Sequence, residues 1–148
     1  MKLTITLQPK GYGAHIWVQP TAPSTVMWIS EIEHNVGTFV AAILAKPDVS
    51  QGKYCSVHTD IMRYGDMINL WGEVMGKRVQ YVQCAAKEFE GIYGPFATEL
   101  ISQYKLNEVA EDWGKAHVGQ LIGATELGLQ KSDLLDLKQA LERDKHLY

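Results

Sequence analysis

The stretch from Trp28 to Cys84 constrains the fold most, because its hydrophobic pattern alternates between the period of a strand and that of a helix. Extended segments are predicted at 26–29, 53–58 and 78–83. One helix is predicted between the first two, with Lys46-Pro47 at its end and an apolar stripe of Ile32, Val36, Phe39, Val40, Ile43 and Leu44. A second lies before Gly76, with a stripe of Tyr64, Met67, Ile68, Trp71, Val74 and Met75. Strand–helix–strand units this compact are usually right-handed crossovers between parallel strands.

The first predicted helix carries two local signals. Ser30-Glu31-Ile32-Glu33 matches a capping box, and a start near Glu33 is the alternative. Gly37 lies inside the helix, where glycine costs roughly 1 kcal/mol relative to alanine. We therefore expect another backbone to approach the helix at Gly37.

The two ends of the chain complete the predicted architecture. Residues 3–7 and 14–18 read as the strands of an N-terminal hairpin. The last third reads as a turn at 86–92, a helix from Gly94-Pro95 toward Trp113, and a terminal helix with Ser132 as its N-cap and Leu134, Leu137 and Leu141 facing inward. The predicted fold is α/β (α+β): a single domain over residues 1–148 with a small mixed sheet, the hairpin, a strand–helix–strand–helix–strand core and a helical C-terminal third.

Composition narrows the classes of function. The 148 residues carry a net charge of −3, and no run of basic residues is longer than Lys77-Arg78, so no nucleic-acid-binding stripe is expected. The longest uncharged apolar window, 36–45, is too short to cross a bilayer, and the N-terminus lacks the pattern of a signal peptide. No CxxC or HxxxH spacing supports a metal site. We expect a cytoplasmic protein that binds neither nucleic acid, nor a membrane, nor a metal.

Three segments carry a resemblance to a known family: residues 28–44, Gln51-Gly52-Lys53-Tyr54, and residues 75–83. They are similar to the NmrA-like branch of the atypical short-chain dehydrogenases/reductases, and the likeness covers roughly residues 15–113. Asn35 departs from the pattern, since relatives often carry an acidic residue there. Such proteins have a Rossmann lobe that binds NAD(P) and a smaller C-terminal lobe that closes over the substrate. This chain resembles only the second lobe.

The nucleotide-binding signature of the first lobe does not occur in this sequence. No G-x-x-G-x-x-G follows an opening strand, and no Tyr-x-x-x-Lys is found. Gly11-Tyr12-Gly13 is no substitute, because a Gly-x-Gly without a following helix N-terminus cannot cradle a pyrophosphate. We therefore expect no cofactor. The surface that faces the Rossmann lobe in relatives would be apolar, so we expect a second copy to cover it in a homodimer that holds a small apolar metabolite.

Candidate catalytic residues are those able to exchange a proton near neutral pH. The candidates are Glu99, which lies beside aromatic residues in the long helix, His58, which ends a strand two residues before Asp60, and His15 in the hairpin. For each, a purely structural role is the alternative. In the resembled family the long helix borders the substrate cavity. The candidate substrate-binding residues are Trp17, Trp28, Phe96, Gln103 and Tyr104.

The sequence therefore favours a non-redox enzyme, such as an isomerase or cyclase, acting on an apolar secondary metabolite. A second class of function is a ligand-binding or regulatory module without turnover. A third is one half of a split NAD(P)-dependent oxidoreductase whose nucleotide lobe is another polypeptide.

Overall fold

The computed structural model describes residues 13–110 and 113–147. These residues form a mixed α/β structure with three two-stranded sheets. They divide into two compact units. Unit 1 holds the described residues of 28–61 and 113–146, and unit 2 holds those of 13–27 and 62–110 together with residue 147. The chain passes between the units within β2 (Val26–Ile29) and β4 (Asp60–Arg63), which pair with each other. That residues 1–148 act as one domain stays a prediction.

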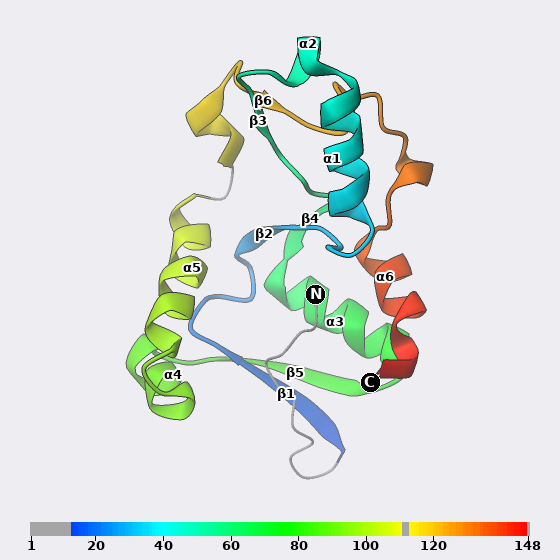
Figure 1. The fold of residues 1–148 in the computed structure, drawn as a ribbon. Helices are drawn as coiled ribbons and strands as arrows, with labels where there is room; N and C mark the ends of the chain where they lie inside the picture. Colours follow the sequence, from blue (N-terminus) through cyan, green and yellow to red (C-terminus); the bar gives the residue numbers. More distant parts are fainter. Residues whose placement is uncertain (1–12, 111–112, 148) are drawn as a thin grey trace. The chain divides into compact units, whose positions relative to one another are not determined.

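Unit 2 is built on a parallel strand pair. β1 (Ala14–Gln19) pairs with β5 (Arg78–Gln83) along its whole length, from Ala14 opposite Arg78 to Gln19 opposite Gln83 (Figure 1). The strand at 78–83 is confirmed. The partner strand expected at 3–7 lies outside the described residues. Because β1 pairs with β5, the strand predicted at 53–58 does not pair with 78–83 in the described structure, and the expected crossover between those two is wrong.

Helix α3 (Tyr64–Met75) packs closely against β5, and Gly72 makes this possible. A Cβ atom at Gly72 would lie 2.8 Å from Cγ2 of Val79 and 2.9 Å from the carbonyl oxygen of Lys77. The predicted apolar stripe of α3 is buried throughout, and Gly76 ends the helix at a φ of 65°, as predicted. Two further helices, α4 (Ala86–Tyr93) and α5 (Ala97–Val109), complete unit 2 and confirm the helical reading of that region.

Unit 1 pairs β3 (Tyr54–Cys55) in parallel with β6 (Leu121–Ile122), beside α1 (Asn35–Ala45) and the short α2 (Pro47–Ser50). Its core joins Phe39 of α1 to Ile122, Leu127 and Leu134. The remaining elements are the 3-10 helices η1 (Trp113–His117), η2 (Lys131–Asp133) and η3 (Lys145–Leu147), and helix α6 (Leu137–Arg143).

Two boundaries predicted in unit 1 are wrong. The strand expected at 53–58 is regular only at Tyr54–Cys55, because β6 is only two residues long and offers no longer partner. The last helix starts at Leu137 rather than near Ser132, because the side chain of Asp136 accepts a hydrogen bond from the Gln139 amide and caps it. The expectation that Leu134, Leu137 and Leu141 face inward is confirmed.

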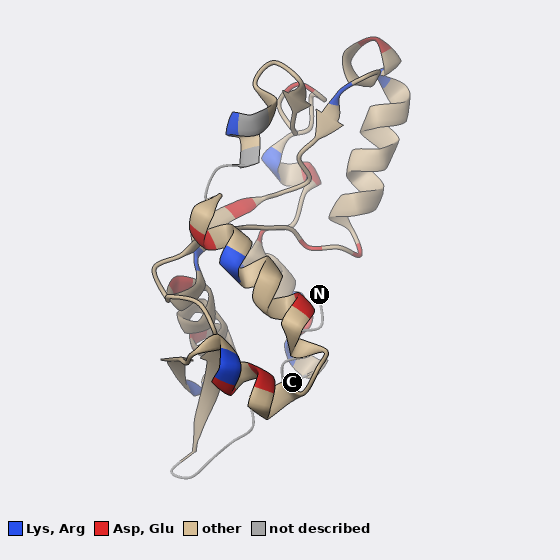
Figure 2. Cartoon of the chain, turned by 90° about the vertical axis from the view of Figure 1, so that its left-hand side faces the viewer, with Lys and Arg blue, Asp and Glu red and all other residues tan. Residues whose placement is uncertain are grey.

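The predicted stripe of α1 is only partly buried. Phe39 is fully enclosed, whereas Val36, Val40 and Leu44 are 39%, 48% and 75% exposed. Helix α1 has no charged residue, and Figure 2 shows it tan along its length. Among the described residues nothing lies within 4 Å of a Cβ built on Gly37, so the backbone expected to approach there is not found. We call Val36, Gly37, Val40, Ala41 and Leu44 the α1 apolar row.

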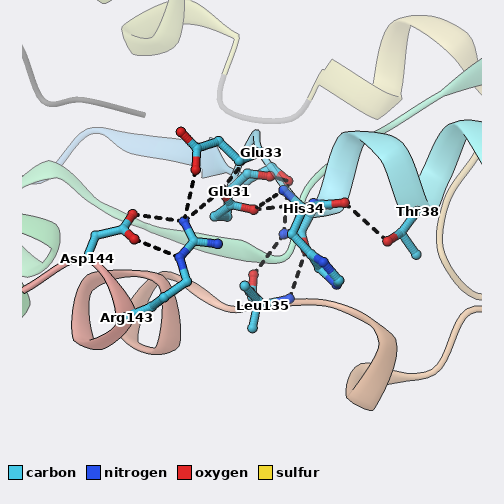
Figure 3. Close-up of polar contacts among 9 residues, drawn as sticks. Glu31, Glu33, His34, Thr38, Leu135, Arg143 and Asp144 are labelled. Carbon is cyan, nitrogen blue, oxygen red and sulfur yellow. Dashed lines mark hydrogen bonds and ion pairs between the residues drawn. The ribbon is translucent and has the colours of Figure 1, made fainter.

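Glu31, rather than Ser30, caps the start of α1. Its carboxylate is buried and accepts hydrogen bonds from the amides of Glu33 (2.8 Å), His34 (2.7 Å) and Asn35 (3.3 Å) (Figure 3). Arg143 of α6 donates to the same carboxylate at 3.1 Å. Burial by itself would raise the pKa of Glu31, but the bonds from the His34 and Glu33 amides and from Arg143 together lower it.

Asn35 ties α1 to the segment before α6. It is fully buried, and its amide nitrogen donates to the carbonyl oxygen of Leu135 while its amide oxygen accepts from the Leu135 N–H, both at 2.8 Å. This reciprocal pair needs one donor and one acceptor on the same side chain. A carboxylate has only acceptors, so an acidic residue at this position would not fit this contact.

Candidate functional site

Aromatic side chains from five elements of unit 2 meet in one cluster. Tyr64 of α3 contacts Trp17 of β1 and Tyr104 of α5, with ring centroids 6.1 and 5.8 Å apart. Phe89 of α4 contacts Tyr104 at 6.1 Å, and Tyr81 of β5 contacts Trp17 at 5.8 Å. We call these five residues the aromatic cluster. Aromatic side chains often line the binding sites of small, mostly apolar molecules.

A row of buried polar atoms follows the face of β1 that points toward the cluster. Alternate residues of a strand share a face, which places His15, Trp17 and Gln19 together. His15 contacts Trp71 of α3, with ring centroids 5.5 Å apart. Nδ1 of His15, Nε1 of Trp17 and both amide atoms of Gln19 are buried without a hydrogen-bond partner among the described residues. We call these three residues the β1 polar row.

The hydroxyl groups of the cluster are held in their neutral form. Burial raises the pKa of Tyr64 to about 12, against the opposing effect of a 2.9 Å hydrogen bond from Asn107. Burial also raises the pKa values of Tyr81 and Tyr104. The Tyr81 hydroxyl donates to the carbonyl oxygen of Thr21. At neutral pH these groups are therefore uncharged and suit a ligand with little charge.

The predicted site residues of unit 2 separate into two groups. The structure brings Trp17 and Tyr104 together on Tyr64, and it places His15 on the same strand face as Trp17. Glu99, Gln103 and Phe96, which is 69% exposed, are open to solvent. The cluster therefore uses only Tyr104 of the α5 residues that the sequence suggested, and the roles of the others stay predictions.

Trp28 and His58 lie in unit 1, where their ring centroids are 4.5 Å apart. The Ser56 hydroxyl lies 2.8 Å from Nδ1 of His58. Burial lowers the pKa of His58 against the opposing effects of Ser56 and Asp60, so its imidazole is more readily neutral. Asp60 itself accepts hydrogen bonds from the Thr59 hydroxyl and the Leu137 amide, which supports a structural role for that carboxylate.

The described residues do not fit a dinucleotide. A pyrophosphate site needs a free helix N-terminus after a strand. The first turn of α1 already binds the Glu31 carboxylate, and the first two amides of α3 donate to the carbonyl oxygens of Thr25 and Pro23. The Glu88 side chain accepts from the Ala85 amide at the start of α4. Gly13 leads directly into strand β1 rather than into a helix. No step through NAD(P) is therefore assigned to these residues.

The described residues contain neither a metal-binding group nor a membrane-spanning helix. Within the described ranges, no group of three or more His, Cys, Asp or Glu side chains is placed to hold a metal ion. None of the helices built from those residues has the length and hydrophobicity needed to cross a bilayer.

Comparison with protein families supplies the remaining evidence. The profile of the NmrA-like family matches residues 2–143, which is nearly the whole chain. The chain belongs to the NmrA-like family. No curated protein matches it. Membership of the NmrA-like family indicates a regulatory or ligand-binding protein of the atypical short-chain dehydrogenase/reductase type.

Sequence reasoning missed Gln19, Tyr64 and Phe89 as possible site residues of this NmrA-like protein. Tyr64 is predicted only as part of the apolar stripe of its helix, and no role is predicted for Phe89. Gln19 lies two residues after Trp17, so the two-residue period of a strand was the available signal. Its complete burial depends on α3 and α5, which lie more than 40 residues away in the chain.

Proposed function

We propose that this protein binds a small, largely apolar metabolite at the aromatic cluster and acts on it without redox chemistry, as an isomerase or cyclase does. We further propose that it corresponds to the substrate lobe of NmrA-like proteins. The observation that carries the proposal is the convergence of Trp17 and Tyr104 on Tyr64, beside buried polar atoms that have no partner among the described residues. Apolar walls with a few polar groups are what a small-molecule site requires.

His15 is the acid–base group that we assign to this site. It is the one predicted catalytic residue on the strand face of Trp17, and Nδ1 of its ring has no partner among the described side chains. An imidazole can accept and return a proton near neutral pH. Moving a proton between two positions of a bound, enolisable substrate needs no cofactor, so one such group is sufficient.

Proton transfer can be tested with 2-indanone, a bicyclic apolar ketone with acidic protons next to its carbonyl group. The rate of deuterium exchange at those carbons is measured by NMR in deuterated buffer with and without protein. We expect faster exchange with the wild type, at least tenfold slower exchange with His15→Gln, and unchanged exchange with Glu99→Gln, because Glu99 is exposed.

The possible results separate the classes of function. If 2-indanone quenches tryptophan fluorescence but exchanges no faster, the protein is a binding or regulatory module. If Tyr104→Ala binds 2-indanone as tightly as the exposed control Gln80→Ala does, the aromatic cluster is not the site. Thermal protection by NADPH would instead support half of a split oxidoreductase and contradict the poor fit of the helix N-termini.

We also propose that the protein forms a homodimer through the α1 apolar row. The exposure of Val40 and Leu44, on a helix that lacks charged residues, supports the expectation that a second copy covers an apolar face. Gly37 and Ala41 have no large side chain, so a second α1 helix can approach closely. Light scattering at micromolar concentration should show a dimer for the wild type and a monomer for Val40→Lys. A monomeric wild type would refute the homodimer.

A further inference from the structure

The most unusual group in unit 2 is the side chain of Gln19. Its exposed fraction is 0%, and neither its amide oxygen nor its amide nitrogen has a hydrogen-bond partner among the described residues. The Gln19 side chain lies close enough to the Tyr104 hydroxyl to oppose the rise that burial causes in the pKa of Tyr104. The geometry of that contact nevertheless falls short of a hydrogen bond. Buried polar groups are nearly always hydrogen-bonded in native proteins, so we expect this amide to have a partner that is not among the described residues.

We infer that the ligand is a planar, largely apolar molecule whose edge carries a hydrogen-bond donor and acceptor side by side, as in a lactam. This inference rests on the proposed function and names its ligand class. A carboxamide presents one acceptor and one donor direction, whichever way its oxygen and nitrogen are placed. A lactam edge supplies the complementary pair and satisfies both atoms of Gln19 at once.

The surroundings of Gln19 favour this class over a charged ligand. Trp17, two residues earlier on the same face, offers a further buried donor at Nε1. Tyr64 and Tyr104 hold neutral hydroxyl groups, and Phe89 is fully buried. No Lys, Arg, Asp or Glu belongs to the aromatic cluster or the β1 polar row. Glu108, whose charge acts on the Tyr81 hydroxyl, is already paired with Lys105 at 2.9 Å. A charged ligand group would therefore lose its hydration without gaining a free ionic partner among these residues.

Entry of the ligand requires side chains to move, because Gln19, Trp17 and Tyr64 are all closed to solvent. Tyr104 is half-buried, and Tyr93, which contacts Phe89 with centroids 4.5 Å apart, is 37% exposed. These two rings form the side of the cluster that solvent reaches. We assign the entry route to them.

The test compares two bicyclic probes, 2-quinolone with a lactam edge and naphthalene without one. Binding of each is measured by tryptophan fluorescence for the wild type, for Gln19→Met and for Gln80→Met, an exposed control in β5. We expect Gln19→Met to lower the preference for 2-quinolone over naphthalene by about tenfold, because two hydrogen bonds are lost. The control should keep the wild-type preference.

A second measurement on the ligand-free protein keeps the inference falsifiable. Methionine has about the length of glutamine but no polar atoms to leave unpaired, so Gln19→Met should be at least as stable to urea as the wild type. A clear loss of stability would show that the amide is already paired and would overturn the inference. So would an unchanged probe preference while naphthalene still binds, which would leave the proposed function standing. If neither probe nor 2-indanone binds, the proposed function fails.

Discussion

Replacing Asn35 with aspartate tests the account of unit 1 directly. In the wild type, the amide of Asn35 exchanges two 2.8 Å hydrogen bonds with the backbone of Leu135. Aspartate keeps the acceptor for the Leu135 N–H, but it turns a second acceptor toward the Leu135 carbonyl oxygen. The backbone N–H of Asn35 donates to the Glu31 carboxylate, so the new carboxylate lies near an existing one.

The expected cost follows from these contacts. One hydrogen bond is lost, at about 1 kcal/mol, and the facing carbonyl oxygen and carboxylate oxygen are left unpaired in a buried place, which adds about 1–3 kcal/mol. We therefore expect Asn35→Asp to lower the free energy of unfolding by roughly 2–4 kcal/mol at pH 7. Burial and the facing carbonyl group should raise the pKa of the new carboxyl group, and its protonated form can donate to Leu135. The difference from wild type should shrink as the pH falls.

Equilibrium unfolding in urea at pH 7 and pH 5 measures both effects. Asn69 is the matched control, because it lies on the exposed face of α3 and Asn69→Asp makes the same chemical change in solvent. The control should stay within about 0.5 kcal/mol of the wild type. If Asn35→Asp is as stable as the control at pH 7, or if its deficit is the same at both pH values, the reciprocal pairing with Leu135 is refuted.

Two further predictions concern packing and pH. Gly72→Ala should destabilise the protein by about 1–3 kcal/mol, because the new methyl group would meet Val79 and the Lys77 carbonyl oxygen. Gly37→Ala should stabilise the monomer by up to about 1 kcal/mol, because no described atom lies within 4 Å of the new methyl group. Thermal unfolding checks this, with Gly37→Ala measured in the monomeric Val40→Lys background so that no dimer contact contributes. A loss of stability in that background would contradict the open space found at Gly37. Glu31 has a lowered pKa in the folded protein, so its stabilising effect is complete above the usual value of 4.5 and is lost as the pH falls through the lowered value. Glu31→Gln should therefore flatten the decline in stability below pH 4.5, and a decline as steep as that of the wild type would refute this role.

Much of the fold could be predicted from local pattern. The stripe and terminal glycine of α3 were sufficient to place that helix, because burial on one face and the left-handed turn at Gly76 depend on residues close together in the chain. The strand at 78–83 was predicted for the same reason. The pairing of β5 with β1 was not, since strand partners are chosen by contacts across more than 60 residues.

The candidate site was predicted less well than the fold. Trp17 and Tyr104 were named from residue type, and the structure brings them together on Tyr64. Glu99 and Gln103 follow the same helix but face solvent, because sequence spacing gives the angle between residues around a helix and not the direction in which the helix is packed. Gln19 had no chemical signal of its own.

The sequence by itself determined the mixture of helices and strands, the family, and the supply of aromatic residues, because these follow from periodicity and residue type. Tertiary structure alone decided which side of α1 is buried, which strands pair, and that a glutamine in β1 is enclosed with no partner in residues 13–110 and 113–147. The physical reason is that burial is a property of the elements that surround a residue. Its cost for a polar group appears only when those elements have closed over it.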